Sequence, residues 1–294
     1  MMTIFSIPKP CAGHIGVIQR NAVRSWSRLR PQCQIILLGD ETGIKELADE
    51  CRGDWIPAIA RNQYGTPLLD SAFARAMASA HFDRLCYINA DIILMDDFLP
   101  AVRRIGYSRY LMAGRRWDVT LSEAWDYDSD NADVRLRQYV ERHGTMHPPS
   151  GSDYFVFPRR AWFEEFPPFA VGRPGWDNWV IYAARKRGIP VIDATGAATV
   201  IHQNHDYQHV PARSSGVWEG PEADRNRELV GGGSCLFTLA DATHILTPRT
   251  LHRALDREHL RRYWVTLPIL VPAIRPVIGA LRRIATWCGV GAAT

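Results

Sequence analysis

The chain has 294 residues, 46% of them hydrophobic, and a formal net charge of +4. This length suffices for one large α/β domain with a buried core plus an appendage. The positive excess is concentrated at the C-terminal end, where from residue 249 onward eight arginines face only Asp256 and Glu258. Because this charge lies in an apolar tail rather than along a face studded with aromatic residues, we do not expect nucleic-acid binding.

The cysteines and the N-terminal residues indicate the cellular compartment of the protein. The six cysteines are scattered, none forms a Cys-x-x-Cys pair, and several lie inside apolar runs. Free buried thiols in a reducing compartment are the expected state. Residues 1–10 lack the charged leader and long apolar core of a secretion signal. We therefore expect a cytoplasmic protein.

Strand and helix patterns alternate along the first third of the chain. They predict strands at residues 3–7, 34–38 and 54–60, and helices at residues 15–28, 44–51 and 68–82. Such alternation predicts a mostly parallel sheet flanked by helices, with ligands at the carboxyl ends of its strands. The chain has no Gly-x-Gly-x-x-Gly and no Walker-type loop, so a metal and arginines would have to hold any phosphates.

The functional prediction depends on residues 85–94. A buried strand at residues 85–88 runs into Asn89, Ala90 and Asp91 and then into a second apolar run. Because side chains alternate along an extended chain, we expect Asn89 and Asp91 on the same side. Burying an unpaired carboxylate is costly, so Asp91 should face a cation, a cluster of donors or solvent. The alternative is that both residues merely turn the chain after a strand.

A strand, an Asp-x-Asp variant and an apolar run resemble the metal and nucleotide-sugar motif of GT-A-fold glycosyltransferases of the family-2 type. The resemblance covers roughly residues 1–245. It implies a Rossmann-like α/β fold, a UDP- or GDP-type sugar donor, and Mn²⁺ or Mg²⁺ bound by Asp91. The first position of the motif is Asn89 here, which removes one negative charge, although an amide oxygen can still coordinate a metal or accept a hydrogen bond.

Two loops are candidates for the nucleotide. Asp40 follows the second strand and resembles the acid that binds the base or ribose in the family, although a turn or capping residue would look the same. The loop before the third helix offers Arg61 and Asn62.

Residues 110–118 read as one strand that delivers Arg115 and Arg116 to the same edge. The planar fork of arginine suits a diphosphate. Surface charge is the commoner role of arginine and remains the alternative.

The second half supplies the acceptor side. Gly151 and Asp153 precede an aromatic strand at residues 154–157 and resemble the segment that lines the donor sugar and the acceptor. Trp176, Asp177 and Asn178 open a helix predicted at residues 179–187 and resemble the acidic motif that supplies the catalytic base of inverting enzymes.

We therefore predict Asp177 as the base, Asp153 as the second candidate, and Gly151, Trp176 and Asn178 as substrate-binding residues. A helix cap is the alternative role for Asp177.

Histidines follow the last predicted core strand, residues 198–201. A histidine at this point resembles the third metal ligand of many GT-A enzymes, and we assign that role to His202, with His205 as the substitute. A zinc site is an alternative, although no cysteine is nearby, and so is a plain polar loop.

We expect residues 1–106 to form the nucleotide-binding half, residues 107–245 the acceptor and metal half, and residues 246–294 a basic amphipathic appendage. The apolar run of the appendage is too short to span a bilayer and is interrupted by Pro268, Pro272 and Pro276. It suits an anchor on an anionic membrane surface, and packing on the catalytic domain or an oligomer contact are the alternatives.

The combined prediction is a metal-dependent enzyme that moves a sugar from a nucleotide-diphosphate sugar to a hydroxyl acceptor on a glycolipid or surface polysaccharide, at the cytoplasmic face of the membrane. Two other functions stay open. One is a nucleotidyltransferase acting on sugar phosphates, weakly disfavoured because the loop after the first strand lacks a glycine- and basic-rich sequence. The other is a non-catalytic scaffold that binds sugar nucleotides or carbohydrate.

Overall fold

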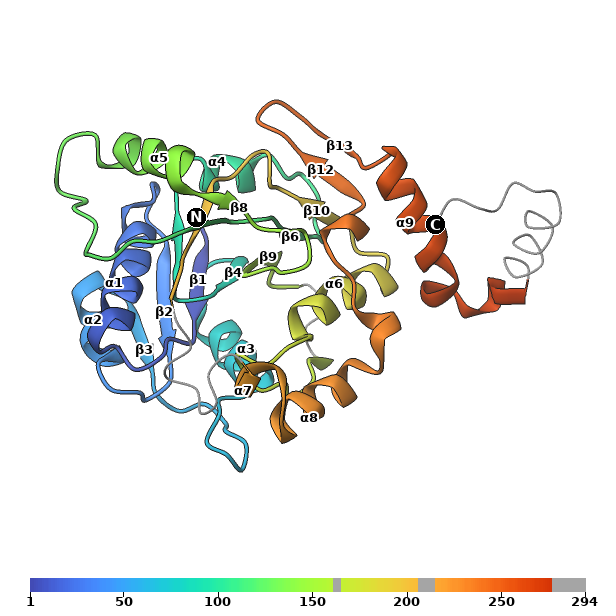
Figure 1. Ribbon diagram of the computed structural model, residues 1–294, viewed down its shortest axis with the longest axis horizontal. Coiled ribbons are helices and arrows are strands. Elements are labelled where there is room, and N and C mark those ends of the chain that lie inside the picture. Colours follow the sequence, from blue (N-terminus) through green and yellow to red (C-terminus); the bar gives the residue numbers. More distant parts are fainter. Residues whose placement is uncertain (161–164, 206–214, 277–294) are drawn as a thin grey trace.

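The computed structural model describes residues 1–160, 165–205 and 215–276. Residues 277–294 of the predicted appendage lie outside the described residues. A nine-stranded sheet forms the centre of the molecule (Figure 1), in the spatial order β13 (Leu251–Arg253), β12 (His244–Leu246), β10 (Val191–Asp193), β6 (Leu111–Ala113), β9 (Tyr154–Pro158), β4 (Arg84–Ile88), β1 (Thr3–Ser6), β2 (Gln34–Leu38) and β3 (Asp54–Ile56).

This sheet is mostly parallel, which confirms the predicted α/β class. β1 pairs in parallel with β2 and β4, β2 with β3, and β10 with β6 and β12. Two strands break the pattern: β9 is inserted antiparallel between β4 and β6, and β13 is antiparallel to β12. The sequence identified β9 as a strand but could not give its direction, because an apolar run does not specify its partner.

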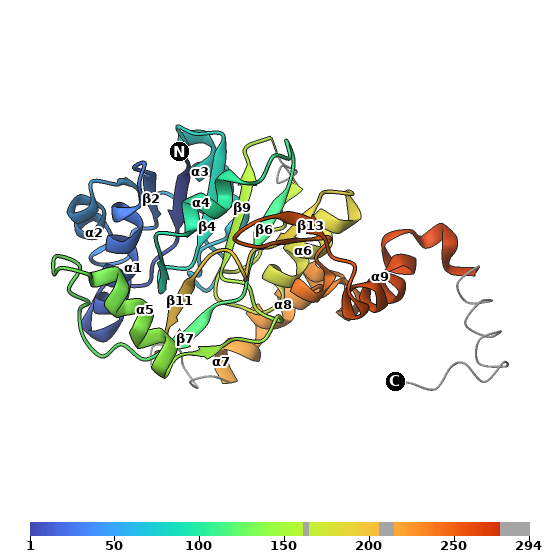
Figure 2. The ribbon, with the colours of Figure 1, turned by 90° about the horizontal axis from the view of Figure 1, so that it is seen from above.

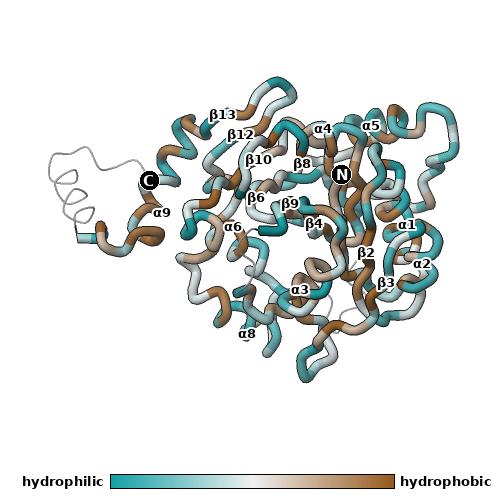
Figure 3. The backbone as a smooth tube through the Cα atoms, turned by 180° about the vertical axis from the view of Figure 1, so that it is seen from behind, coloured by the Kyte–Doolittle hydropathy of each residue, from teal (hydrophilic) through white to brown (hydrophobic). Residues whose placement is uncertain are grey.

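Helices cover both faces of the sheet, and a hydrophobic core lies on each face. Because side chains alternate along a strand, each strand contributes residues to both cores. Ile4 packs into the core under α1 (Gly13–Arg28), α2 (Ile44–Cys51) and α4 (Phe98–Arg103). Its neighbour Phe5 packs into the core under α3 (Leu69–Ser79) and α6 (Trp176–Lys186). In Figure 3 the hydrophobic residues are concentrated along the central strands.

A smaller sheet in the order β5 (Ile92–Leu94), β11 (Val200–Gln203), β7 (Trp117–Val119) and β8 (Thr145–Met146) lies beside the main one, next to α5 (Ala132–His143) (Figure 2). The single strand predicted at residues 110–118 is wrong, because β6 belongs to the main sheet and β7 to the small one. The antiparallel β5–β11 register pairs His202 with Ile92 and so brings the histidine beside Asp91.

The C-terminal part extends the core. The β12–β13 hairpin continues the main sheet past residue 245, the expected boundary. The remaining helices are α7 (Ser215–Trp218), α8 (Pro221–Val230) and α9 (Arg257–Leu270). α9 is tied to the core by Arg262, which donates to Asp241 at 2.6 Å, and by Tyr263, whose ring lies 5.7 Å from the Arg185 guanidinium. None of the described helices is long and apolar enough to cross a membrane.

Candidate active site

A cleft of about 610 Å³ lies at the carboxyl ends of the parallel strands β1, β2 and β4. Its walls include residues 7–10 after β1, Glu41 after β2 and residues 89–91 after β4. The carboxyl edge is where ligands bind in open α/β sheets, because the loops that follow successive parallel strands converge there. The cleft therefore lies where the alternation of strands and helices predicted a ligand site.

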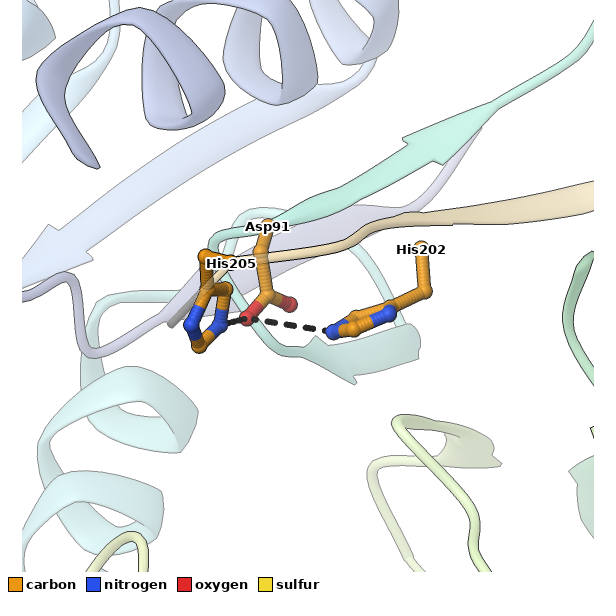
Figure 4. Close-up of side chains that lie close together, drawn as sticks. All are labelled: Asp91, His202 and His205. Carbon is orange, nitrogen blue, oxygen red and sulfur yellow. Dashed lines mark hydrogen bonds and ion pairs between the residues drawn. The ribbon is translucent and has the colours of Figure 1, made fainter. Parts of the chain in front are cut away.

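Asp91, His202 and His205 form a cluster within this cleft (Figure 4). One ligand atom from each lies within 4.8 Å of the others. Asp91 Oδ2 is 3.1 Å from His205 Nε2 and 3.9 Å from His202 Nε2. Its other oxygen, Oδ1, is buried and has no hydrogen-bond partner among the described residues. A buried carboxylate oxygen left without a donor, next to two imidazole nitrogens, fits a divalent cation.

The backbone of Asp91 is held by its neighbours. Ile92 N donates to Asn89 O at 3.2 Å, so residues 89–92 form a turn, and the expectation of an extended chain with alternating side chains is wrong here. Asn89 and Asp91 nevertheless both line the cleft. Gln203, fully buried, donates to Asp91 O from its side-chain amide at 3.1 Å and from its backbone at 3.2 Å.

Charges within the cluster shift the pKa values of its side chains. Burial alone would raise the pKa of Asp91, but the hydrogen bond from His205 and the charges of His202 and Lys9 outweigh it and hold that pKa well below its usual range. Burial opposes the charged form of His202, yet Asp118 and Asp91 raise its pKa above the ordinary value. Asp91 is therefore ionised and ready to bind a cation at neutral pH.

Asp118 links the cluster to the opposite wall, a role that the sequence did not reveal. Its carboxylate lies 3.0 Å from His202 Nδ1 and 2.7 Å from His147 Nδ1, and it accepts a hydrogen bond from Arg116 Nε at 2.9 Å. Burial would raise the pKa of Asp118, but these three donors lower it well below its usual range. The only sequence signal was an acid directly after the Arg-Arg-Trp segment, and His147 gave none.

Asp153 accepts hydrogen bonds from two of the predicted residues. Asn89 Nδ2 donates to Asp153 Oδ1 at 2.8 Å, and Arg116 Nη1 donates to Asp153 Oδ2. All three residues line the cleft. Asn89 thus donates to an acid of the cleft, and Arg116 is already shared between two carboxylates.

Asp177 lies in the first turn of α6 and accepts a hydrogen bond from Ser152 N at 3.4 Å. It is not the helix cap, since Gly175 takes that position and α6 begins at Trp176, three residues earlier than predicted. Burial, with a contribution from the charge of Asp153, raises the pKa of Asp177 to about 6. Asp177 is not among the cleft-lining residues, whereas its neighbour Trp176 is.

Comparison with known proteins gives structural matches alone, since no family model and no curated protein matches the chain. Glucosyl-3-phosphoglycerate synthase from Mycobacterium tuberculosis, with Mn²⁺, UDP and glucosyl-3-phosphoglycerate, matches at 14% identity over 70% of this chain and 72% of that one, with a TM-score of 0.42. The mannosyltransferase PcManGT from Pyrobaculum calidifontis, with GDP-Man and Mn²⁺, matches at 12% identity over 72% and 58%, with a TM-score of 0.43. S. aureus TarS matches at 9% identity over 40% of this chain and 22% of its own length, with a TM-score of 0.33.

The matched proteins are GT-A-type glycosyltransferases. This is the family that the sequence resembles. Because these three structures have TM-scores below 0.5 and identities below 25%, a function for this chain has to be argued from its own site.

The remaining residues implied by the GT-A resemblance are spread around the cleft. Arg61 lines it and pairs with Asp40 and with Glu41, the latter at 2.7 Å, while Asp40 is outside the lining. Asn62 donates to Glu222 Oε1 at 2.6 Å and is also outside it. Their predicted contacts with a nucleotide stay predictions.

Three other predicted residues lie outside the lining. Arg115 donates to the backbone oxygen of His147 at 2.5 Å, and Asn178 donates to that of Phe237 at 2.7 Å. A Cβ on Gly151 would lie 3.1 Å from the His147 ring. These contacts stabilise the loops behind the cleft, and the predicted substrate contacts stay predictions. Trp176 is only 6% exposed and packs in a T-shaped contact with Tyr87, so little of its ring is accessible in the cleft.

Proposed function

We propose that this chain is a metal-dependent glycosyltransferase that moves a sugar from a nucleotide-diphosphate sugar to a hydroxyl acceptor. The observation that carries the proposal is the unpartnered, buried Oδ1 of Asp91 beside His202 and His205 at the carboxyl edge of the sheet. Asp91, His202 and His205 would hold Mn²⁺ or Mg²⁺. When bound, the ion supplies Lewis-acid stabilisation of the charge on the departing nucleoside diphosphate.

Asp177 is the proposed base that deprotonates the acceptor hydroxyl. Two observations support this role: Asp177 is next to the cleft-lining Trp176, and its pKa of about 6 is near the working pH, where a general base works best. Asp153, the second candidate, already binds Arg116 and Asn89, so its oxygens are engaged. Its proposed role is to fix the position of Arg116.

The proposed acceptor is a hydroxyl of a glycolipid or surface polysaccharide, reached from the cytoplasmic face of a membrane. Leu260, Trp264 and Val265 of α9 are exposed and neighbour Arg261, a composition that favours an anionic lipid surface. The cysteines at positions 11, 33, 51, 86 and 235 are free thiols, in keeping with a reducing compartment.

Calorimetric titration with UDP and GDP, with and without Mn²⁺, tests the donor site. We expect one of the two to bind in a manner that requires Mn²⁺, and Asp91→Ala to abolish that dependence. Asp130→Ala, at an exposed aspartate, serves as the matched control.

Product analysis then tests the reaction. Release of the free nucleoside diphosphate together with a glycosylated acceptor supports the proposal, and release of pyrophosphate identifies a nucleotidyltransferase instead. Metal-dependent nucleotide binding without any turnover would assign the chain to the non-catalytic scaffold class.

A further inference from the structure

Lys9 differs from the other long cationic side chains that line the cleft, which are Arg61, Arg116 and Arg173. Each arginine is held in an ion pair: Arg61 with Glu41 at 2.7 Å, Arg116 with Asp118 at 2.9 Å, and Arg173 with Glu222 at 2.6 Å. Lys9 forms no ion pair with any described residue. Of these four cations, it is therefore the one that is not held in an ion pair by a described residue.

The backbone of Lys9 is held in place by a buried glutamine. Its backbone N–H donates to Gln19 Oε1 at 2.7 Å, and its carbonyl oxygen accepts from Gln19 Nε2 at 2.9 Å. Gln19 is only 2% exposed, so its side chain is itself enclosed by the packing around it. Prolines at positions 8 and 10 restrict the backbone further. The side chain therefore starts from a fixed point at the end of β1 and does not belong to a freely moving surface loop.

The charge around Lys9 indicates what it binds. Lys9 and Asp91 line the same cleft. Burial lowers the pKa of Lys9, and the charge of Asp91 acts in the opposite direction. A divalent cation on the Asp91 cluster would neutralise that carboxylate and leave the half-buried ammonium without a counter-charge. The complementary group is an anion that bridges the metal and the lysine.

We propose that Lys9 binds the diphosphate of the sugar donor directly. The inference rests on the proposed function and assigns to a lysine the phosphate contact that the sequence had suggested for Arg115 and Arg116. An ammonium is a compact point charge that suits phosphate oxygens without requiring a fixed bidentate geometry. Arg116, shared between Asp118 and Asp153, then serves to join the walls of the cleft.

Calorimetry on Lys9→Met and Lys9→Arg, with UDP and GDP in the presence of Mn²⁺, tests this assignment. Loss of one charge-assisted hydrogen bond is expected to weaken diphosphate binding by about 10- to 100-fold in Lys9→Met. Lys9→Arg should recover part of that loss. Mn²⁺ alone should bind Lys9→Met at least as tightly as wild type, because a nearby positive charge has been removed. Lys45→Met, at an exposed lysine of α2, is the matched control and should bind like wild type.

The outcomes separate this inference from the proposed function. Diphosphate binding by Lys9→Met within twofold of wild type overturns the role of Lys9 and leaves the glycosyltransferase proposal intact. Equal weakening of diphosphate and of Mn²⁺ alone also overturns it, since the substitution would then act through the metal cluster. Failure of the wild-type protein to bind either nucleotide overturns the proposed function together with this inference.

Discussion

Asp118 Oδ1 lies 3.0 Å from Nδ1 of His202, while Nε2 of the same ring faces Asp91 Oδ2 at 3.9 Å. A carboxylate this close to Nδ1 favours the proton on that nitrogen and leaves the Nε2 lone pair for a metal, although the contact does not meet hydrogen-bond geometry. The two acids therefore lie at opposite ends of one imidazole, Asp91 as the proposed metal ligand and Asp118 as the group that would orient the ring.

Asp118→Asn should weaken Mn²⁺ binding by about 10- to 100-fold, the usual cost of losing such an outer carboxylate. An amide can present only one acceptor, whereas His147, His202 and Arg116 all approach this side chain. Titration calorimetry with Mn²⁺ measures the loss, with Asp128→Asn at an exposed aspartate as control. Unchanged Mn²⁺ affinity in a folded Asp118→Asn protein would show that the ring needs no such support.

The ligand set predicts a choice of metal. Two imidazole nitrogens and one carboxylate favour Mn²⁺ over Mg²⁺, because Mg²⁺ prefers oxygen ligands and keeps its waters. We expect the wild-type protein to bind Mn²⁺ at least about tenfold more tightly than Mg²⁺. His205→Asp, which replaces a nitrogen ligand by an oxygen ligand, should reduce the ratio of Mn²⁺ affinity to Mg²⁺ affinity. A wild-type preference for Mg²⁺ would contradict binding by both histidines.

Asp177→Asn should stabilise the protein while impairing transfer. The pKa of Asp177 is raised from 3.8 to about 6 in the folded state, so the unfolded chain loses this proton first as the pH rises, and stability falls through that window. Since one pKa unit is about 1.4 kcal/mol, removing the buried charge should raise the free energy of unfolding at pH 8 by up to about 3 kcal/mol.

This gain should disappear as the pH approaches 4, where Asp177 is protonated in the folded protein. Denaturant unfolding at pH 8 and pH 4 measures the difference. Asp224→Asn, in the first turn of α8 and exposed, is the matched control. A gain that does not depend on pH would mean that the cost of ionising Asp177 is not its cause.

The rate of sugar transfer should fall below about pH 6, roughly tenfold per pH unit, because Asp177 must be ionised to accept a proton. Two charged or titratable groups interact with Asp177, namely Asp153 and Tyr87. Burial raises the pKa of Tyr87 far above neutrality, so the phenol stays uncharged. The rate is measured at saturating Mn²⁺, so that loss of metal does not imitate the effect. If the Asp177→Asn variant transfers sugar at a near-normal rate, and its rate falls at low pH as in wild type, Asp177 is not the base.

The sequence by itself determined the alternation of strands and helices and the residues at several strand ends. β2 and α2 run over the predicted residues, because one is a clear apolar run and the other an amphipathic stripe, and such periods are local properties. Asp91, His202 and His205 could be singled out because their places in the chain resemble those of the metal-binding residues of GT-A-fold glycosyltransferases, and not because a local period marks them.

Only the tertiary structure decided which of these residues meet. The antiparallel pairing of β5 with β11 joins segments about 110 residues apart in the chain, and it brings both histidines to Asp91. The insertion of β9 and the division of residues 110–118 between two sheets place Asp118 and Asp153 around Arg116, so this arginine is neutralised and Lys9 is left as the free cation of the described cleft. Strand direction and ion pairing depend on partners distant in sequence, and no local period encodes them.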